Sequence, residues 1–463
     1  MGDLNSDRRQ GRDAVTKKIL LNAFDMNTPG HQSNGLWRHP RDQSHRYGAL
    51  DYWTDLAKTL ERGLFDGIFI ADVTGLYDVY GGSPDAALRA GVQVPTNDPF
   101  TVVPAMAAVT EHLGFGITAS IPYLHPYSFA RLISSLDHLT EGRMGWNVVT
   151  GYLSSAAKGV GQQAQTGHDT RYDIANEFME VVYKLWEGSW EDDAVIRDVD
   201  SGVYTDPSKV HRVQHDGTYF ALDAIHLCEP SAQRSPVIYQ AGASPKGMAF
   251  SGAHAECVFV ANHNPKAVAK QVKSIREVAV SNGRAAEDVK AFALLSVVTG
   301  ETDEEAQKKF DEYHDVGIAE GSLALISGWT GVDFAGHDLD SRIDNIDSDA
   351  IRSIASSLGA KTVNEWADYL VVGGAAPVVV GSPKTVVDRM EQWIDETGVD
   401  GFNLSYTVMP ECVNDFVDLI VPEMQRRGVY KTEYESGTLR DKLFGHGARL
   451  SAPHPAAAYR VSS

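Results

Sequence analysis

The sequence predicts an α/β protein folded as a (β/α)8 barrel with insertions. Short apolar segments rich in β-branched residues alternate with amphipathic helical patterns along most of the chain. This alternation implies parallel strands joined by right-handed crossovers. About eight such segments can be counted, and a chain of 463 residues is long enough for one barrel with insertions. The count favours a closed barrel over an open sheet.

The first half of the chain supplies four strands and four helices. Trp53, Leu56 and Leu60 recur at helical spacing, so they predict one apolar face on the first helix. The expected strands are residues 19–24, 67–71, 116–121 and 143–150, and the expected helices are 51–62, 99–113, 127–139 and 172–186.

Two insertions interrupt the second half. The first covers about residues 191–235 and contains Asp216-Gly217, a hairpin turn signal between two strand-like segments. The second covers about residues 316–380 and is expected to be irregular apart from a helix at 347–358. The remaining strands are expected at residues 236–240, 256–261, 289–298 and 401–405.

The last helix has clear end signals. Ser382-Pro383 is an N-cap followed by proline at the first helical position, and Gly398 is placed to end the helix after residue 396. Residues 17–445 are therefore expected to form one barrel domain. The polar residues 1–16 and the Ala/Pro/Ser-rich residues 446–463 are expected to be mobile tails.

Composition excludes several functions. The net charge is −21 without a dense Lys/Arg cluster, which argues against nucleic acid or an anionic membrane as a partner. We find no apolar segment of about 20 residues and no secretory signal, so a cytoplasmic enzyme is expected. Cys228, Cys257 and Cys412 lack metal-site or disulfide spacing, and no metal site is expected. Rossmann, P-loop and serine-hydrolase motifs are also missing from the sequence.

Small polar residues occur at the ends of four expected strands. Asp72, Thr118, Asn147 and Ser244 are the main examples, with Gly242 in the loop before Ser244. In a barrel the strand ends and the loops that follow them carry the active site, so these residues predict a ligand site at one face.

Two local motifs leave two interpretations open. Gly242 and Ser244 could bring backbone amides and a hydroxyl to a phosphate, or they could form an ordinary turn with an N-cap serine. His168 and Tyr172 are four residues apart and could donate hydrogen bonds to such a ligand, or they could cap and pack their helix.

Seven ordered motifs resemble one family. The chain resembles the bacterial luciferase-like flavin monooxygenases, in the branch of nitrilotriacetate monooxygenase, pristinamycin synthase and dibenzothiophene sulfone monooxygenase. Residues 22–27, 30–31 and 36–40 are closer to dimethyl sulfide monooxygenase-like and riboflavin lyase-like members. The motifs that carry the resemblance are residues 60–66, 105–114, 135–143, 146–150, 168–173 and 240–244, with 432–435 and 439–441 together as the last.

The resemblance implies a luciferase-like TIM barrel with an FMN site at its C-terminal face. Reduced FMN would be a co-substrate with O2, supplied by an NAD(P)H:flavin reductase, and the enzyme would be a homodimer or homotetramer. Carried over by position, the FMN contacts fall on Asp72, Thr118, His168, Tyr172 and Ser244, with Asn147 near the isoalloxazine ring and Gly242 in the phosphate loop.

The implied reaction is a monooxygenation through a flavin peroxide that cleaves a C–S or C–N bond of a small organic substrate. His168 would manage a proton or only hydrogen-bond the flavin, and Asn147 would assist at the ring. Trp329 stands where the dibenzothiophene branch has a histidine, so dibenzothiophene sulfone is a poor substrate candidate. The expected pocket walls are Phe24, Trp37, Tyr123, Trp329 and the second insertion.

Three other functions fit the same sequence. The chain could be a riboflavin lyase that cleaves riboflavin to lumichrome and a sugar, a non-catalytic flavin-binding protein, or a deazaflavin-dependent dehydrogenase on the same barrel.

Overall fold

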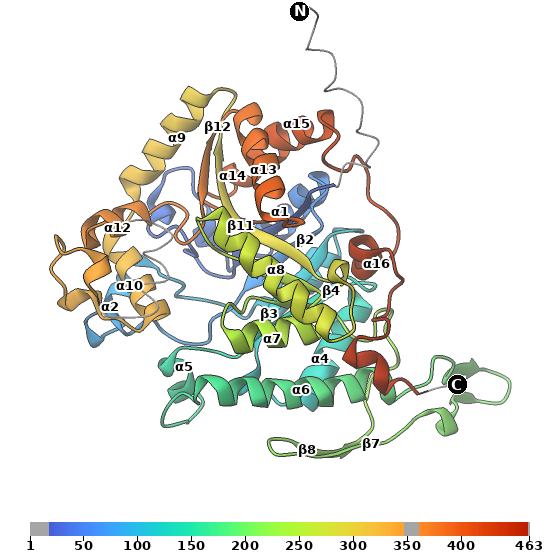
Figure 1. Cartoon of the computed structure of the whole chain (residues 1–463). Helices are drawn as coiled ribbons and strands as arrows, with labels where there is room; N and C mark the ends of the chain where they lie inside the picture. Colours follow the sequence, from blue (N-terminus) through green and yellow to red (C-terminus); the bar gives the residue numbers. More distant parts are fainter. Residues whose placement is uncertain (1–17, 347–360, 462–463) are drawn as a thin grey trace, which may run out of the picture.

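The predicted barrel is present and closed. The computed structural model describes residues 18–346 and 361–461, so the expected tail 1–16 and the expected helix 347–358 lie outside the described residues. Eight parallel strands pair in the order β1-β2-β3-β4-β9-β10-β11-β13 and back to β1 (Figure 1). The strands are β1 (Leu20–Met26), β2 (Gly67–Ala71), β3 (Gly114–Ser120), β4 (Met144–Val149), β9 (Val237–Gln240), β10 (Cys257–Val260), β11 (Lys290–Thr299) and β13 (Gly401–Ser405).

Aromatic rings fill the inside of the barrel. Phe24 stacks on Phe69 with 5.0 Å between ring centroids, and Phe69 lies 4.3 Å from Phe259. Tyr239 stacks on the other side of Phe259 at 5.4 Å. A Cβ on Gly145 would lie 2.4 Å from the Tyr239 ring, so the strand can pass this ring only because position 145 is glycine.

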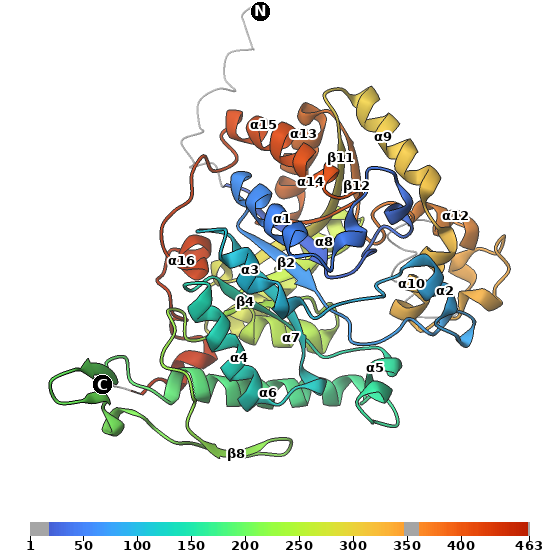
Figure 2. The same cartoon turned by 180° about the vertical axis from the view of Figure 1, so that it is seen from behind.

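A ring of helices encloses the strands. Around the barrel, α1, α3, α4, α6, α7, α8 and α13 contact one another in that order, and the π-helical turn Phe416–Ile420 links α13 back to α1 (Figures 1 and 2). Their bounds are α1 (Leu50–Arg62), α3 (Val103–Ala107), α4 (Pro126–Leu139), α6 (His168–Gly188), α7 (Pro245–His254), α8 (Pro265–Ser281) and α13 (Pro383–Thr397). The helix expected over 99–113 is reduced to α3, because a 3-10 turn at Pro99–Thr101 precedes it and a turn follows it.

The first insertion is built of two hairpins. The expected hairpin is β7 (Val213–Asp216) with β8 (Ala221–Ala224), and a second one, β5 (Val195–Asp198) with β6 (Val203–Thr205), precedes it. Glu177 of α6 fixes the turn of the β7–β8 hairpin, since its carboxylate accepts hydrogen bonds from the backbone N–H groups of residues 218–220.

The second insertion is more regular than expected. The prediction of an irregular segment over 316–380 is wrong for α10 (Ala319–Thr330), α12 (Val363–Tyr369) and β12 (Val378–Gly381), which pairs with β11 outside the barrel ring. Helix α10 contacts both α12 and α2 (Asp85–Ala90), and α2 comes from the loop after β2 (Figures 1 and 2). The other α-helices within residues 18–346 and 361–461 are α5 (Ser154–Gly159), α9 (Asp303–Val316), α14 (Glu411–Asp415), α15 (Val421–Arg426) and α16 (Leu439–Phe444).

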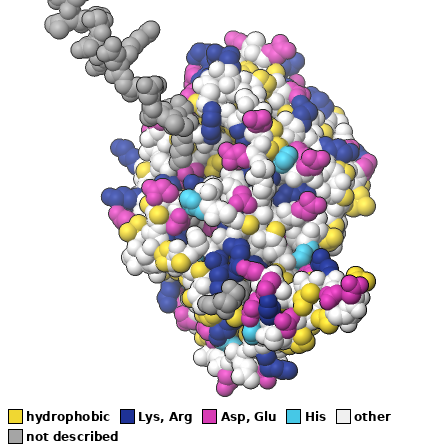
Figure 3. Space-filling view, turned by 90° about the vertical axis from the view of Figure 1, so that its right-hand side faces the viewer, with side chains coloured by type: hydrophobic (Ala, Val, Ile, Leu, Met, Phe, Trp, Pro, Cys, Tyr) yellow, Lys and Arg dark blue, Asp and Glu magenta, His cyan; other side chains and the backbone are white. Residues whose placement is uncertain are grey.

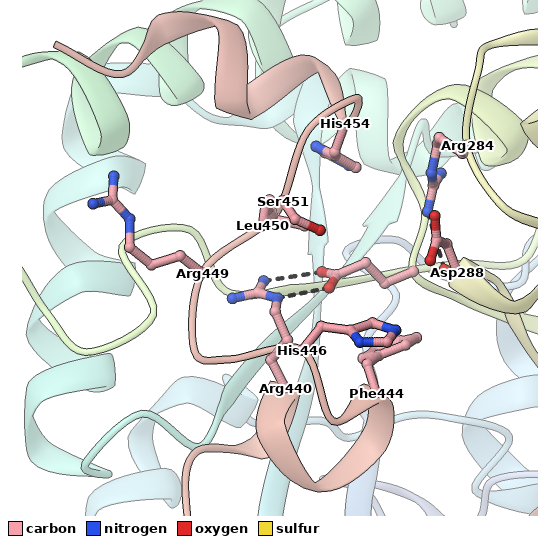
Figure 4. Close-up of a pocket in the computed structure, with 10 residues that line it drawn as sticks. Arg284, Asp288, Arg440, Phe444, His446, Arg449, Leu450, Ser451 and His454 are labelled. Carbon is pink, nitrogen blue, oxygen red and sulfur yellow. Dashed lines mark hydrogen bonds and ion pairs between the residues drawn. The ribbon is translucent and has the colours of Figure 1, made fainter. Parts of the chain in front are cut away.

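The described C-terminal residues pack on the barrel and do not form the expected mobile tail. Arg449 and Arg460 both reach the fully buried carboxylate of Glu187, at 2.7 and 3.1 Å. His454 is 4% exposed and its Nε2 lies 2.9 Å from the carbonyl oxygen of His254. Arginine and histidine anchors thus hold a segment whose composition alone resembles a tail. Figure 4 shows Arg449 and His454 on this segment beside the buried Arg440.

Charged side chains of both signs are interspersed on the face of the molecule seen in Figure 3. No helix among the described residues is long and apolar enough to cross a membrane.

Candidate active site

Two predicted residues meet on neighbouring strands at the C-terminal face. Thr118 of β3 and Asn147 of β4 are register partners, and Asn147 Nδ2 donates a 3.0 Å hydrogen bond to Thr118 Oγ1. Both residues are 3% exposed, and Asn147 Oδ1 is buried without a hydrogen-bond partner. A buried amide oxygen without a donor is costly, so it marks a position where a ligand N–H group would be stabilised.

The start of α7 forms the second part of the site. Ser244 is the N-cap, Pro245 follows it, and the Ser244 hydroxyl accepts a 3.0 Å hydrogen bond from the backbone N–H of Gly247. Gln240, the last residue of β9, accepts a 2.6 Å hydrogen bond from the N–H of Gly242 and another from the Ser251 hydroxyl. Ser244 therefore caps α7, as expected if the loop is an ordinary turn with an N-cap serine. A helix N-terminus also attracts anions, so the phosphate interpretation is compatible with the same geometry.

His168 and Tyr172 lie at this helix start. His168 Nε2 is 3.3 Å from Ser244 Oγ, and its Nδ1 is 2.8 Å from Asp169. The His168 and Tyr172 rings meet edge to face at 5.2 Å. Burial raises the pKa of Tyr172, whose hydroxyl remains a neutral hydrogen-bonding group. Three predicted residues from α6 and the β9–α7 loop are thus brought together.

Two glycines keep this corner open. A Cβ on Gly242 would lie 2.8 Å from the Cα of Gly247, and a Cβ on Gly247 would lie 2.8 Å from the Tyr172 hydroxyl. Side chains here would fill the space between the loop, the helix start and Tyr172. The hydroxyls, the imidazole and the backbone N–H groups fit a phosphate ester, and the orphaned Asn147 oxygen fits the N–H edge of a flavin ring.

Asp72 follows β2 at the same face. Burial, with a smaller contribution from the charge of Asp98, raises the pKa of Asp72 to about 6. Its carboxyl group therefore changes protonation state near neutral pH, which is unusual for aspartate and typical of ligand sites.

The four expected wall residues lie in different surroundings. Phe24 belongs to the aromatic stack inside the barrel and also meets His31 edge to face at 4.3 Å. Tyr123 ends the 3-10 turn that follows β3, and its hydroxyl oxygen accepts a 3.3 Å hydrogen bond from Gln165 Nε2. Trp329, on α10, donates to Tyr77 at 3.3 Å. Trp37 donates at 2.9 Å to Ala90 at the end of α2.

Sequence reasoning missed a group of side chains beside this site. Tyr77, Gln93 and Tyr152 come from the loops after β2 and β4 and join Trp329 in one hydrogen-bonded network. Tyr152 is only two residues beyond Thr150, so its place after a strand was a usable signal. Gln93 offers no such signal, because only the folded loop brings it to Tyr77.

Comparison with known proteins places this geometry in a family. The model of the family described as luciferase-like monooxygenase matches residues 31–401. Dimethyl-sulfide monooxygenase of Hyphomicrobium sulfonivorans is 51% identical over 96% of this chain and 94% of its own length. Its crystal structure matches with a TM-score of 0.93, covering 96% of each chain.

Two further relatives are similar along their whole length. Long-chain alkane monooxygenase of Geobacillus thermodenitrificans is 49% identical over 96% of this chain and 99% of its own. The crystal structure of a riboflavin lyase, solved with modified FMN and riboflavin, has a TM-score of 0.90 and 37% identity, covering 96% of this chain and 100% of that one.

Proposed function

Because the chain belongs to the luciferase-like monooxygenase family, we propose that it uses reduced FMN and O2 to cleave a C–S bond of a small thioether. The observation that carries the choice of substrate is the 51% identity, over 96% of this chain, to a relative named for dimethyl sulfide. An NAD(P)H:flavin reductase would supply the reduced FMN.

The FMN phosphate would be held at the start of α7. Ser244 and His168 would contact it, Tyr172 would close the corner, and Gly242 and Gly247 would let it approach the backbone. The His168 contact with Ser244 supports a role at the phosphate end for this histidine, which differs from the proton-managing role also considered for it.

The ring end would be held by the strand ends. Asn147 Oδ1 would accept from a ring N–H group, Thr118 would fix the Asn147 amide, and Asp72 would lie at the edge of the ring or the ribityl chain. When bound, reduced FMN supplies the two electrons and the site of O2 activation. The protein itself binds, orients and keeps water away from the reacting atoms.

The reaction balances for dimethyl sulfide. Hydroxylation of one methyl carbon gives a hemithioacetal that breaks at the C–S bond: (CH3)2S + O2 + FMNH2 → CH3SH + HCHO + FMN + H2O. One oxygen atom enters formaldehyde and the other enters water, and FMNH2 supplies two electrons and two protons.

Oxygen uptake tests the proposal. The protein, FMN, NADH and a flavin reductase should consume O2 in response to dimethyl sulfide and release methanethiol and formaldehyde. No substrate-dependent uptake and no formaldehyde would refute the thioether reaction. Lumichrome formed from riboflavin under the same conditions would select the riboflavin lyase activity, which the 37% identical structure favours as the second candidate.

Two variants test the FMN site. Ser244→Ala and Asp72→Ala should each raise the FMN dissociation constant about tenfold, since each removes one polar contact of about 1–2 kcal/mol. Ser208→Ala, an exposed hydroxyl in the first insertion, is the control and should leave FMN affinity unchanged. Unchanged FMN affinity in both site variants would place FMN elsewhere.

A further inference from the structure

A wall of three aromatic side chains stands beside the proposed flavin site. Tyr152 is two residues beyond Thr150, whose side chain interacts with the Tyr172 hydroxyl, so the loop that carries Tyr152 starts at the proposed phosphate site. The Tyr152 and Tyr77 hydroxyl oxygens are 2.6 Å apart, and Trp329 Nε1 lies 3.3 Å from the Tyr77 hydroxyl. We call Tyr77, Tyr152 and Trp329 the aromatic wall.

The hydrogen bonds of the wall have a fixed direction. Gln93 Nε2 faces the carbonyl oxygen of His31 at 3.0 Å, and because a carbonyl only accepts, the amide nitrogen must be the donor there. Gln93 Oε1 is then the acceptor for Tyr77, at 2.8 Å. Tyr77 has one proton and gives it to Gln93, so Tyr152 must donate to Tyr77.

This direction leaves the wall without a free donor. The Tyr152 proton and the Trp329 N–H both point to the Tyr77 oxygen, and the Tyr77 proton points to Gln93. Burial also raises the pKa of Tyr152 to about 12, so its hydroxyl stays protonated. A carboxylate or another anion gains no hydrogen bond from such a surface, whereas an uncharged sulfur atom packs well against aromatic rings.

The wall is also backed by packed side chains. A Cβ on Gly328 would lie 2.1 Å from the Tyr77 ring, so α10 is pressed directly against it. Tyr77 lies in a small apolar core with Ala86, Ala87, Ala90, Val92, Leu153, Ala156, Ala324 and Leu325. This core joins the loops after β2 and β4 to the second insertion. A wall supported in this way cannot retreat to admit a long substrate without breaking the core.

Tyr152 differs from Tyr77 because 45% of the residue is exposed, although its hydroxyl is hydrogen-bonded inside the wall. Part of Tyr152 therefore remains accessible outside the wall. We propose that Tyr152 and Trp329 are specificity-determining residues that limit the substrate to compact, uncharged thioethers and exclude long alkyl chains and polycarboxylates. This inference rests on the proposed function, and it specifies the size and charge of the thioethers that the enzyme accepts.

The test compares a short and a long sulfide in binding and in turnover. Binding of dimethyl sulfide and dibutyl sulfide to the complex with oxidised FMN is measured by the change in flavin absorbance, and kcat/KM is measured for both in the reductase-coupled assay. The wild-type protein should prefer dimethyl sulfide at least tenfold. Trp329→Ala should reverse or remove that preference by raising kcat/KM for dibutyl sulfide about tenfold or more.

Tyr152→Phe keeps the ring and removes the hydrogen bond to Tyr77. It should relax the length preference less than Trp329→Ala, because the bulk of the wall remains. Leu339→Ala, an exposed residue on the same insertion, and Tyr219→Phe, a 41% exposed tyrosine on the first insertion, are the matched controls and should leave the preference unchanged.

The outcomes separate the two proposals. If the wild-type protein binds and oxidises both sulfides equally, or if Trp329→Ala binds FMN normally and leaves the preference unchanged, the wall does not set specificity and the proposed function stands. If no sulfide binds or is consumed by the wild-type protein, the proposed function fails. Binding of nitrilotriacetate as tight as that of dimethyl sulfide would overturn the charge limit.

Discussion

The two ends of the barrel satisfy their buried polar groups in different ways. At the N-terminal ends of the strands, Asp66, Glu256 and Asp400 each precede a strand and accept a hydrogen bond from a backbone N–H of a neighbouring strand or its start. Each also pairs with a cation: Lys431, Arg440 and Arg276 in the same order. All three carboxylates close strand ends; Asp66 and Glu256 also fix the C-terminal segment, and Asp400 fixes α8.

At the C-terminal ends of the strands, several buried polar atoms have no partner. They are Asn147 Oδ1, His31 Nδ1, Ser296 Oγ and Ser405 Oγ. Ser296, Ser405 and Phe24 share one register level on β11, β13 and β1, so this layer faces the mouth of the barrel. Unpartnered atoms are not confined to the mouth, since Asn22 Nδ2 near the start of β1 and Asn403 Oδ1 in the middle of β13 also lack a partner. The carboxylates at the N-terminal ends stabilise the barrel, whereas the polar atoms at the mouth are available for a ligand, as is general for barrel enzymes.

The largest effect is expected from Arg440→Ala at the paired end. Arg440 and Glu256 side chains are 3% and 5% exposed, so removing the guanidinium leaves a buried carboxylate unpaired. The free energy of unfolding at pH 7, measured by urea denaturation, should fall by about 3–5 kcal/mol.

Two companion variants make this prediction specific. Arg426→Ala breaks an ion pair whose arginine side chain is 70% exposed, so it should lower the free energy of unfolding far less than Arg440→Ala. The double variant Arg440→Met with Glu256→Leu should recover only part of the loss, because it leaves no unpaired charge in this ion pair but removes the hydrogen bonds of both side chains to backbone groups. A loss below about 1 kcal/mol in Arg440→Ala would mean that the buried ion pair does not stabilise the N-terminal end of the barrel.

The comparison also shows what the sequence could predict. The eight strands were predictable because buried parallel strands are short, apolar and β-branched, and those strands in turn place Thr118 and Asn147 toward one face of the barrel. The aromatic wall was not predictable, since Tyr77 and Tyr152 come from loops after two different strands and meet Trp329 of α10 only in the folded chain. The C-terminal anchors were missed for a similar reason. Arg449 and Arg460 bind Glu187, which lies more than 250 residues earlier in the sequence, so the local sequence does not reveal the contact.

An intermediate effect is expected at Asp25, a buried carboxyl group near the end of β1. Burial raises its pKa to about 7, with a smaller contribution from the charge of Asp42. The folded protein therefore binds more protons than the unfolded chain between about pH 4 and pH 7, and stability falls as pH rises through that window. The slope from this one group is at most about 1.4 kcal/mol per pH unit.

Asp25→Asn should remove this slope and make the protein more stable than wild type above pH 7. Urea denaturation of both proteins at several pH values gives the difference curve. Asp66→Asn at the paired end should have the opposite sign at pH 7, because it loses the ion pair with Lys431. Parallel curves for wild type and Asp25→Asn would show that Asp25 does not titrate in this range.

The smallest effect tests the comparison most directly, because it uses two serines that are both 0% exposed. Ser235, before β9, donates a 2.8 Å hydrogen bond to Glu187, whereas Ser296 Oγ at the mouth has no partner. Ser235→Ala should cost about 1–3 kcal/mol because it strips a donor from a buried carboxylate. Ser296→Ala should lower the free energy of unfolding by about 0.5 kcal/mol or less, or raise it slightly. A buried hydroxyl without a hydrogen-bond partner does not stabilise the folded state, so its removal costs little. Equal losses in the two variants, measured by urea denaturation, would mean that Ser296 has a partner in solution, such as ordered water. The buried polar groups of both barrel ends would then have hydrogen-bond partners. The ends would differ only in the kind of partner, which is protein at one end and water at the other.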